Sequence, residues 1–434
     1  MLGTVHRDVI EKLLSRVTAK STPADDIHCL VALTKVAATR TNPQSAATAL
    51  ALVNLDIKIR LQGLKQDSNW HDRITELYSE LSRIDPVVPE VIAEQQGFGQ
   101  PGHVLFLQHI PEDKTQTAID GFANFVKTDV DYEWSNDVVF VIGRSGQAIH
   151  KQLIRDQVNN LAVQDAVLMV MARSPQPEDR MIYLDGLNST QLRAVEASVE
   201  AIAKLPRSND PDEQHRLLSA ARRLHNDEPE YKLRESVLRL LENNNVQGFQ
   251  FVYGNDGHNE QTEALTRVES YLKQRYPDFK PSLDGNAADQ VLNVLHEVEW
   301  QKGDSTRGEN LFSRLSCTRC HSGRKALGPD LQGVARRFSR EDLFAAIVDP
   351  NRDISERYQL TTVQTKSGQV FSGLVVNESV GGIMIRDSDH KTYRIDSEDI
   401  DVKFRQRRSL MPDGLLKNVG DQDLADLNAY LRKL

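Results

Sequence analysis

The spacing of hydrophobic residues changes along the chain, so that some segments have a helical spacing and others have the alternation of strands. Over residues 5–300, apolar residues recur three and four positions apart, which is the spacing of amphipathic helices. Residues 188–205 are the clearest example, because their apolar side chains fall on one helical face. Over residues 359–405, apolar and polar residues alternate, as they do in strands. We therefore expect a mainly α protein with a small β insertion.

The helical segments of residues 1–300 come in pairs, separated by short loops rich in Asp, Ser and Pro. Pairs at a period of roughly 40 residues resemble HEAT-type α-solenoid repeats, in which each pair buries its apolar face against the next. We therefore expect an N-terminal, HEAT-like helical array over residues 1–300. A non-repetitive helical domain is the alternative, because the likeness lies in the pattern and not in a sharp motif.

The composition argues against several classes of protein. The chain has 53 basic and 62 acidic side chains, a net charge of −9. A duplex-binding protein needs a basic face to neutralise phosphates, so no nucleic-acid partner is expected. The longest apolar runs fall far short of the roughly 18 residues that cross a bilayer, so no transmembrane segment is expected. Residues 1–300 show no convincing group of nucleophile, base or metal ligands, which disfavours intrinsic catalysis.

Only three cysteines occur, which is too few for a disulfide framework. Cys29 lies in an apolar helical segment and is expected to be a small core side chain. Cys317 and Cys320 stand with His321 in the sequence CTRCH, a C-x-x-C-H frame. This frame is the attachment signature of haem c.

The spacing in CTRCH suits this chemistry. Two thiols about one helical turn apart can both add to the vinyl groups on one edge of a porphyrin, and His321 would then lie beneath the iron. Three rival interpretations remain. A redox-active dithiol would lie in a βαβ unit, and none is visible here. A zinc site needs four ligands, and only scattered histidines could complete it. A pentapeptide can also occur by chance.

Further motifs surround CTRCH, namely GENLF before it and GPDL, SLMP and DLADLNAYL after it. Together they resemble a monohaem c-type cytochrome domain. More narrowly, residues 303–434 resemble the planctomycete-type haem-binding domain at the C-terminal end of large secreted bacterial proteins, commonly behind HEAT-like helices and a dehydrogenase-like β-propeller. The resemblance implies a cytochrome c-like helical domain over residues 301–434 with one covalently bound haem c. The alternating residues 359–405 are expected to form a small antiparallel β-barrel inserted in it.

The resemblance also implies roles for single residues. The backbone carbonyl of Pro329, in GPDL, would accept a hydrogen bond from the free ring nitrogen of His321, which orients the ring and strengthens it as a ligand. Leu331 would pack on the porphyrin. Gly308 would permit a close crossing of the first and last helices of the domain, with Phe312 packing there against two residues of the last helix, Tyr430 and Leu431.

Met411 is the expected second axial ligand. After His321 the chain has two methionines and one histidine, and Met411 lies in SLMP, just before the last helix, where a cytochrome of this type supplies its thioether. Met384 lies in a strand-like run and His390 in a turn. A five-coordinate iron and ligation by His390 are the alternatives.

These expectations favour an electron carrier. A His/Met pair raises the reduction potential and fills both axial positions, which favours electron transfer over oxygen chemistry. The partner would be a dehydrogenase, or a dehydrogenase domain preceding this chain, together with an electron acceptor. The alternative is a protein-binding helical scaffold with a structural or sensory haem.

The expected location follows from the cofactor. Haem c is attached outside the bacterial cytoplasm, which implies a periplasmic or otherwise exported protein. The first twenty residues lack the continuous apolar stretch of an export signal. We therefore expect this chain to be the rear part of a longer exported protein, or a version of it with a misplaced start. The alternative is that CTRCH never receives haem.

Overall fold

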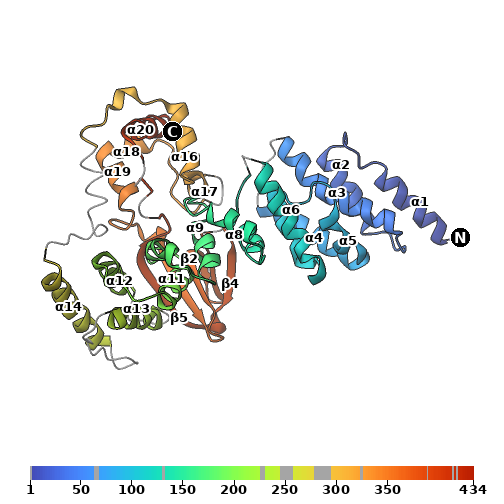
Figure 1. The fold of residues 1–434 in the computed structure, drawn as a ribbon. Coiled ribbons are helices and arrows are strands. Elements are labelled where there is room, and N and C mark those ends of the chain that lie inside the picture. The colour runs from blue at the N-terminus through green and yellow to red at the C-terminus, as the bar shows by residue number, and fades with distance from the viewer. Residues whose placement is uncertain are drawn as a thin grey trace. The chain divides into compact units, whose positions relative to one another are not determined.

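The computed structural model describes ten stretches of the chain: residues 2–62, 68–129, 132–224, 230–244, 258–277, 295–322, 326–388, 390–412, 415–416 and 419–434. The chain divides into two compact units, Met1–Val163 and Gln164–Leu434 (Figure 1). The domain boundary predicted at residue 300 lies inside the second unit.

The described part of the first unit is helical. Its α-helices are α1 (Leu2–Leu14), α2 (Pro23–Leu33), α3 (Asn42–Leu61), α4 (Ser68–Ile84), α5 (Val87–Val91), α6 (Thr115–Thr128), α7 (Asn136–Ile142) and α8 (Ala148–Arg155). Short 3-10 helices, labelled η, lie between them: η1 (Ile92–Glu94), η2 (Pro101–His109) and η3 (Glu112–Lys114). Cys29 of α2 is buried in the core, as expected. Among the described residues of the whole chain, no helix is long and apolar enough to span a bilayer.

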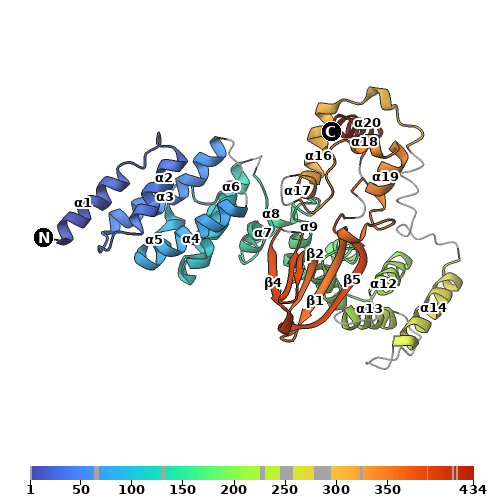
Figure 2. The same ribbon diagram turned by 180° about the vertical axis from the view of Figure 1, so that it is seen from behind.

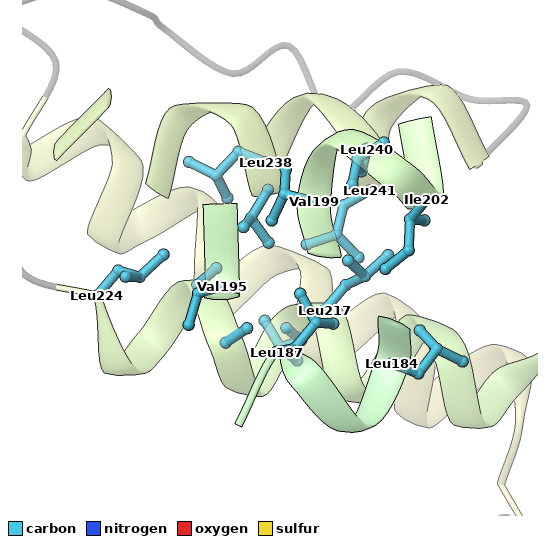
Figure 3. Close-up of a cluster of buried hydrophobic side chains, with 14 of the residues drawn as sticks. Leu184, Leu187, Val195, Val199, Ile202, Leu217, Leu224, Leu238, Leu240 and Leu241 are labelled. Carbon is cyan, nitrogen blue, oxygen red and sulfur yellow. The ribbon is translucent and has the colours of Figure 1, made fainter. Parts of the chain in front are cut away.

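The second unit begins with further helices: α9 (Gln164–Met171), η4 (Pro177–Asp179), α10 (Arg180–Gly186), α11 (Leu192–Lys204), α12 (Pro211–Arg223), α13 (Glu230–Asn244) and α14 (His258–Arg275). The apolar face predicted within residues 188–205 is buried, because Val195, Val199 and Ile202 of α11 are each less than 5% exposed. They pack with leucines of α10, α12 and α13 into one core (Figure 3). The helix itself begins at Leu192, later than predicted.

The remaining segment of the second unit begins and ends with helices, and its strands lie in the middle of the segment. The helices are η5 (Trp300–Lys302), α16 (Ser305–Arg314), α17 (Cys317–His321), α18 (Val334–Arg337), α19 (Arg340–Val348), η6 (Glu356–Tyr358), η7 (Ser397–Asp399) and α20 (Asp421–Lys433). The strands are β1 (Gln359–Thr365), β2 (Val370–Ser379), β3 (Gly382–Arg386), β4 (Thr392–Asp396) and β5 (Ile400–Ser409).

Helices α16 and α20 cross closely, as predicted. A Cβ added to Gly308 would lie 2.0 Å from the backbone oxygen of Asp426, so only glycine allows this approach. The ring centroids of Phe312 and Tyr430 lie 5.3 Å apart, and Leu431 belongs to the same buried cluster. The crossing therefore depends on a missing side chain on one helix and an aromatic pair between the two.

An ion pair beside this crossing ties the start of α16 to α20. The Nε and Nη2 atoms of Arg307 lie 2.6 and 2.7 Å from the two carboxylate oxygens of Asp426. The backbone N–H of Asp304 donates to the same carboxylate at 2.7 Å. The hydrogen bond from Arg307 lowers the pKa of Asp426, whose side chain is buried. Bidentate geometry makes such a pair stronger than a single contact between point charges.

The predicted β-barrel is wrong, although the predicted strands are present. The five strands form an antiparallel sheet in the order β4-β3-β2-β1-β5, so β4 and β5 are its edges and the sheet is open. The sheet contains a buried apolar cluster, formed by Val363, Ile383, Ile385 and Ile395. Phe371, Val375 and Ile400, which belong to the same sheet, pack against it. The sheet thus buries one apolar cluster without closing.

The sheet lies beside helices of the same unit (Figure 2), and polar contacts join it to them. The buried Gln406 amide of β5 donates to the Glu230 carboxylate of α13 and, at 2.8 Å, to Thr362 Oγ1 of β1. Arg408 donates to the backbone oxygens of Asn188 and Ser189, at 3.2 and 2.6 Å. The helices expected over residues 1–300 are present in the described stretches, but they do not belong to one compact unit. Helices α1–α8 form one unit, while α9–α14 share the other with the sheet.

We expect Gly308→Ala to destabilise the α16–α20 crossing by about 2 kcal/mol. The added methyl would force two backbones apart, a cost of about 3 kcal/mol, while alanine returns about 1 kcal/mol of helix propensity. Asn310→Ala is the matched control, because Asn310 is exposed on the same helix. Amide hydrogen exchange in α16 and α20 measures the loss. Equal exchange in the two variants would contradict the prediction.

Candidate haem-attachment site

The CTRCH sequence forms a short helix, α17, directly after α16. Ser316 separates the two helices and has a left-handed backbone with a φ of 60°, which turns the chain at this point. Cys317 and Cys320 are three positions apart in α17, so their side chains project from the same side of the helix. Both thiols are free and partly buried.

The two cysteines contact different apolar clusters. Cys317 packs against a helical cluster that includes Leu311, Phe312, Phe344 and Leu424. Cys320 packs against a smaller cluster formed by Leu327, Leu360 of β1, Leu374 of β2 and Leu410. CTRCH therefore lies between the helical core and one end of the sheet.

Burial keeps both thiols protonated at neutral pH. It raises the pKa of Cys317 to about 11 and also raises the pKa of Cys320. A redox-active dithiol requires the opposite, a pKa lowered by positive charge or by a helix N-terminus. The environment of these two cysteines therefore disfavours the dithiol interpretation of CTRCH.

His321 is held in one orientation by the loop that follows it. Its Nδ1 lies 2.9 Å from the backbone oxygen of Pro329. A Cβ added to Gly328 would lie 2.6 Å from Cε1 and 2.7 Å from Nδ1 of the ring, so the imidazole packs directly on this glycine. Because a carbonyl oxygen can only accept, Nδ1 carries the proton when the ring is neutral. Burial lowers the pKa of His321, although the hydrogen bond to Pro329 opposes this, so the ring is neutral at neutral pH.

These features leave the other ring nitrogen available. Nε2 of His321 has no hydrogen-bond partner among the residues that the structure describes. A neutral imidazole that donates through Nδ1 presents its lone pair at Nε2, which is the state that binds a metal. The donor chemistry of His321 and the two free thiols thus fit a covalently attached haem.

Leu331 packs against the helical cluster that Cys317 also contacts. Its loop is tied to α17, because the backbone N–H of Gly328 donates to Cys320 O at 2.7 Å. Leu331 therefore anchors residues 328–334, the His321 loop, to the helical core.

Met411 is placed by its neighbours. Its backbone N–H donates to Ser409 Oγ at 3.0 Å, and Leu410, directly before it, belongs to the cluster that contacts Cys320. Met384 instead lies inside the sheet, where β3 pairs it with Arg394 of β4. His390 lies in the connection between β3 and β4, with a φ of 61°. Of the three candidate ligands, Met411 is thus the one whose adjoining residue shares a cluster with CTRCH.

A protein-built metal centre is not found in the described stretches, which contain no group of three or more His, Cys, Asp or Glu side chains suited to a metal ion. A haem requires a different donor set, because four ligands of its iron come from the porphyrin. The protein supplies only axial ligands such as His and Met.

The sequence did not reveal two contacts of this site. GPDL was recognised for its proline, whereas the structure shows that its glycine also contacts the His321 ring. Arg337 of α18 donates to backbone oxygens of the His321 loop. Backbone acceptors leave no trace in the sequence, so no motif could have indicated this second contact.

Comparison with known proteins adds no relative. No family model matches the chain, and no curated protein matches it either.

We expect Gly328→Ala to disturb the ring of His321. The methyl would overlap the imidazole, so the ring must turn and lose its hydrogen bond to Pro329. Nitrogen-15 NMR of the ring should show mainly the Nδ1-protonated tautomer in the wild type and a mixture of tautomers in the variant. Gly420→Ala is the control, because a Cβ there meets no atom within 4 Å. An unchanged tautomer in Gly328→Ala would contradict the prediction.

Proposed function

We propose that residues 301–434 carry one covalently bound haem c and that the protein transfers electrons. The observation that supports this most directly is the arrangement of His321. Its neutral ring donates from Nδ1 to Pro329 O, and its Nε2 is left without a partner among the described residues, directly after two free thiols. A structural histidine would more commonly use both nitrogens in hydrogen bonds.

The thiols supply the attachment. Cys317 and Cys320 would each add across one vinyl group, sulfur bonding to one carbon and hydrogen to the other, so the addition would be neither an oxidation nor a reduction. His321 would hold the iron through Nε2, and Pro329 would fix the direction of its ring. The bound haem supplies a reversible one-electron couple.

Met411 is the proposed second ligand, so that both axial positions are filled by protein. Leu410 supports this, because it brings the chain directly before Met411 into contact with the cluster around Cys320. With His321 and Met411 both bound to the iron, no position would be left for a substrate. The protein would then pass electrons between a dehydrogenase, or a dehydrogenase domain, and an acceptor protein in the periplasm or another exported location.

Replacing both motif cysteines should abolish covalent haem. The chain, given an export signal, is produced in a bacterial host that matures haem c, and covalent haem is read by peroxidase staining after denaturing electrophoresis. We expect staining of the wild type and none of Cys317→Ala plus Cys320→Ala. Cys29→Ala removes the third cysteine, buried in the first unit, and should stain fully.

The outcome decides between two classes of function. Equal staining of the double variant, or no staining of the wild type, would reject the haem assignment. A well-folded chain that never takes up haem would favour the scaffold alternative, in which the helices bind another protein.

Replacing Met411 should leave haem attached but change its ligation. In Met411→Ala we expect loss of the long-wavelength band of methionine-bound ferric haem and a reduction potential lower by on the order of 0.1–0.3 V, within the about 0.8 V that axial ligands span. Met384→Leu, inside β3, is the matched control and should change neither property. His390→Ala tests the alternative ligand. Absence of the band in the wild type, with a reduction potential that changes in His390→Ala and not in Met411→Ala, would reverse the assignment.

A further inference from the structure

The loop of residues 328–334, here called the His321 loop, carries the carbonyl that orients the proposed iron ligand. One end is tied to α17, because Gly328 N donates to Cys320 O at 2.7 Å. The other end enters α18, where Val334 N donates to Leu331 O at 3.0 Å. The backbone carbonyl of Pro329, which accepts the hydrogen bond from His321, lies between these two points. The orientation of His321 therefore depends on how firmly the middle of this loop is held.

One side chain holds that middle part. Arg337, at the end of α18, donates from Nη2 to Asp330 O and from Nη1 to Gln332 O, both at 3.0 Å. A single planar guanidinium thus bridges two carbonyls of the loop, and the first belongs to the residue directly after Pro329. The rigid fork of arginine suits this task, because its two N–H donors have a fixed relative geometry that an ammonium group lacks.

We propose that Arg337 is a positioning residue for the haem ligand. By fixing the peptides at Asp330 and Gln332, it fixes the direction of the Pro329 carbonyl and, through that carbonyl, the ring of His321. This inference rests on the proposed function of His321 as the iron ligand. Arg337 acts through the loop and touches neither iron nor ligand in this account.

The neighbouring Arg336 provides a matched control. It lies on the same short helix and is exposed, and its side chain has no hydrogen bond or ion pair with the residues described by the structure. Arg336→Ala and Arg337→Ala remove the same charge at adjacent positions. A difference between them therefore reports the two hydrogen bonds and not the charge. Arg337→Lys keeps the charge and can restore one hydrogen bond, so it should give intermediate results and also serves if Arg337→Ala folds poorly.

The first measurement is amide hydrogen exchange of the full chain, with and without haem. Two hydrogen bonds on an exposed surface should slow local opening by about fivefold. We therefore expect amides of the His321 loop to exchange about fivefold faster in Arg337→Ala than in Arg336→Ala, with exchange in α16 and α20 unchanged. Faster exchange throughout these helices would show a general structural role and overturn the proposal.

The second measurement uses the haem-loaded chain. A looser Pro329 carbonyl weakens the Nδ1 hydrogen bond, which makes His321 a weaker donor to ferric iron. We expect a higher reduction potential and faster exchange of the His321 ring N–H in Arg337→Ala than in Arg336→Ala. Equal values in the two variants would overturn the proposal.

If the proposed function itself is wrong, these experiments give a different result. In that case the wild-type chain takes up no haem at all under maturing conditions. A ligand-positioning role for Arg337 then fails with it, even if the His321 loop of Arg337→Ala still exchanges faster. If instead every variant carries haem and Arg336→Ala and Arg337→Ala behave alike, only the positioning role is rejected.

Discussion

The crossing of α16 and α20 is the contact on which the C-terminal half of the second unit depends. It joins residues 122 positions apart, since the backbone N–H of Asp304 donates to the side chain of Asp426. Bringing together two ends of so long a chain segment costs conformational entropy, and strong local contacts must offset this cost. Gly308 lets the two backbones touch, and Arg307 adds two charge-assisted hydrogen bonds beside them. In the sequence, the segment between these two helices contains CTRCH, the His321 loop and the whole sheet. The contact between α16 and α20 therefore holds the two ends of this segment together.

The sheet links CTRCH to the helices that precede it. Leu360 of β1 and Leu374 of β2 contact the cluster around Cys320, while Gln406 and Arg408 of β5 contact α13 and the residues before α11. Both sets of contacts lie within one compact unit. The inserted strands are therefore not a free appendage. They pack beside Cys320 and are fixed to the helices by polar contacts.

Local contacts were predictable from the sequence where the contact requires a particular residue type, such as glycine at a close approach of two helices. Gly308 and Phe312 were predicted at the helix crossing and are found there, and the alternating residues 359–405 form strands. The 2.9 Å contact between His321 and Pro329 was implied by resemblance and is present. Closure of the sheet was not predictable, because alternation shows which side chains share a face but not how strongly the strands tilt. Helical periodicity likewise shows which face is buried but not what covers it, and so the division into two units was missed.

Burial has opposite consequences for the two chemistries that CTRCH could support. Raising the pKa of Cys317 suppresses the thiolate that a redox dithiol needs, whereas lowering the pKa of His321 favours the neutral imidazole that binds a metal. Around the haem proposed above, the same apolar surroundings would limit access of water to the iron. Because ferric haem carries more positive charge than ferrous haem, a low-polarity shell disfavours the oxidised form and raises the reduction potential. One physical cause, the placement of α17 between two apolar clusters, thus disfavours thiol redox chemistry and favours the ligand state that electron transfer through haem requires.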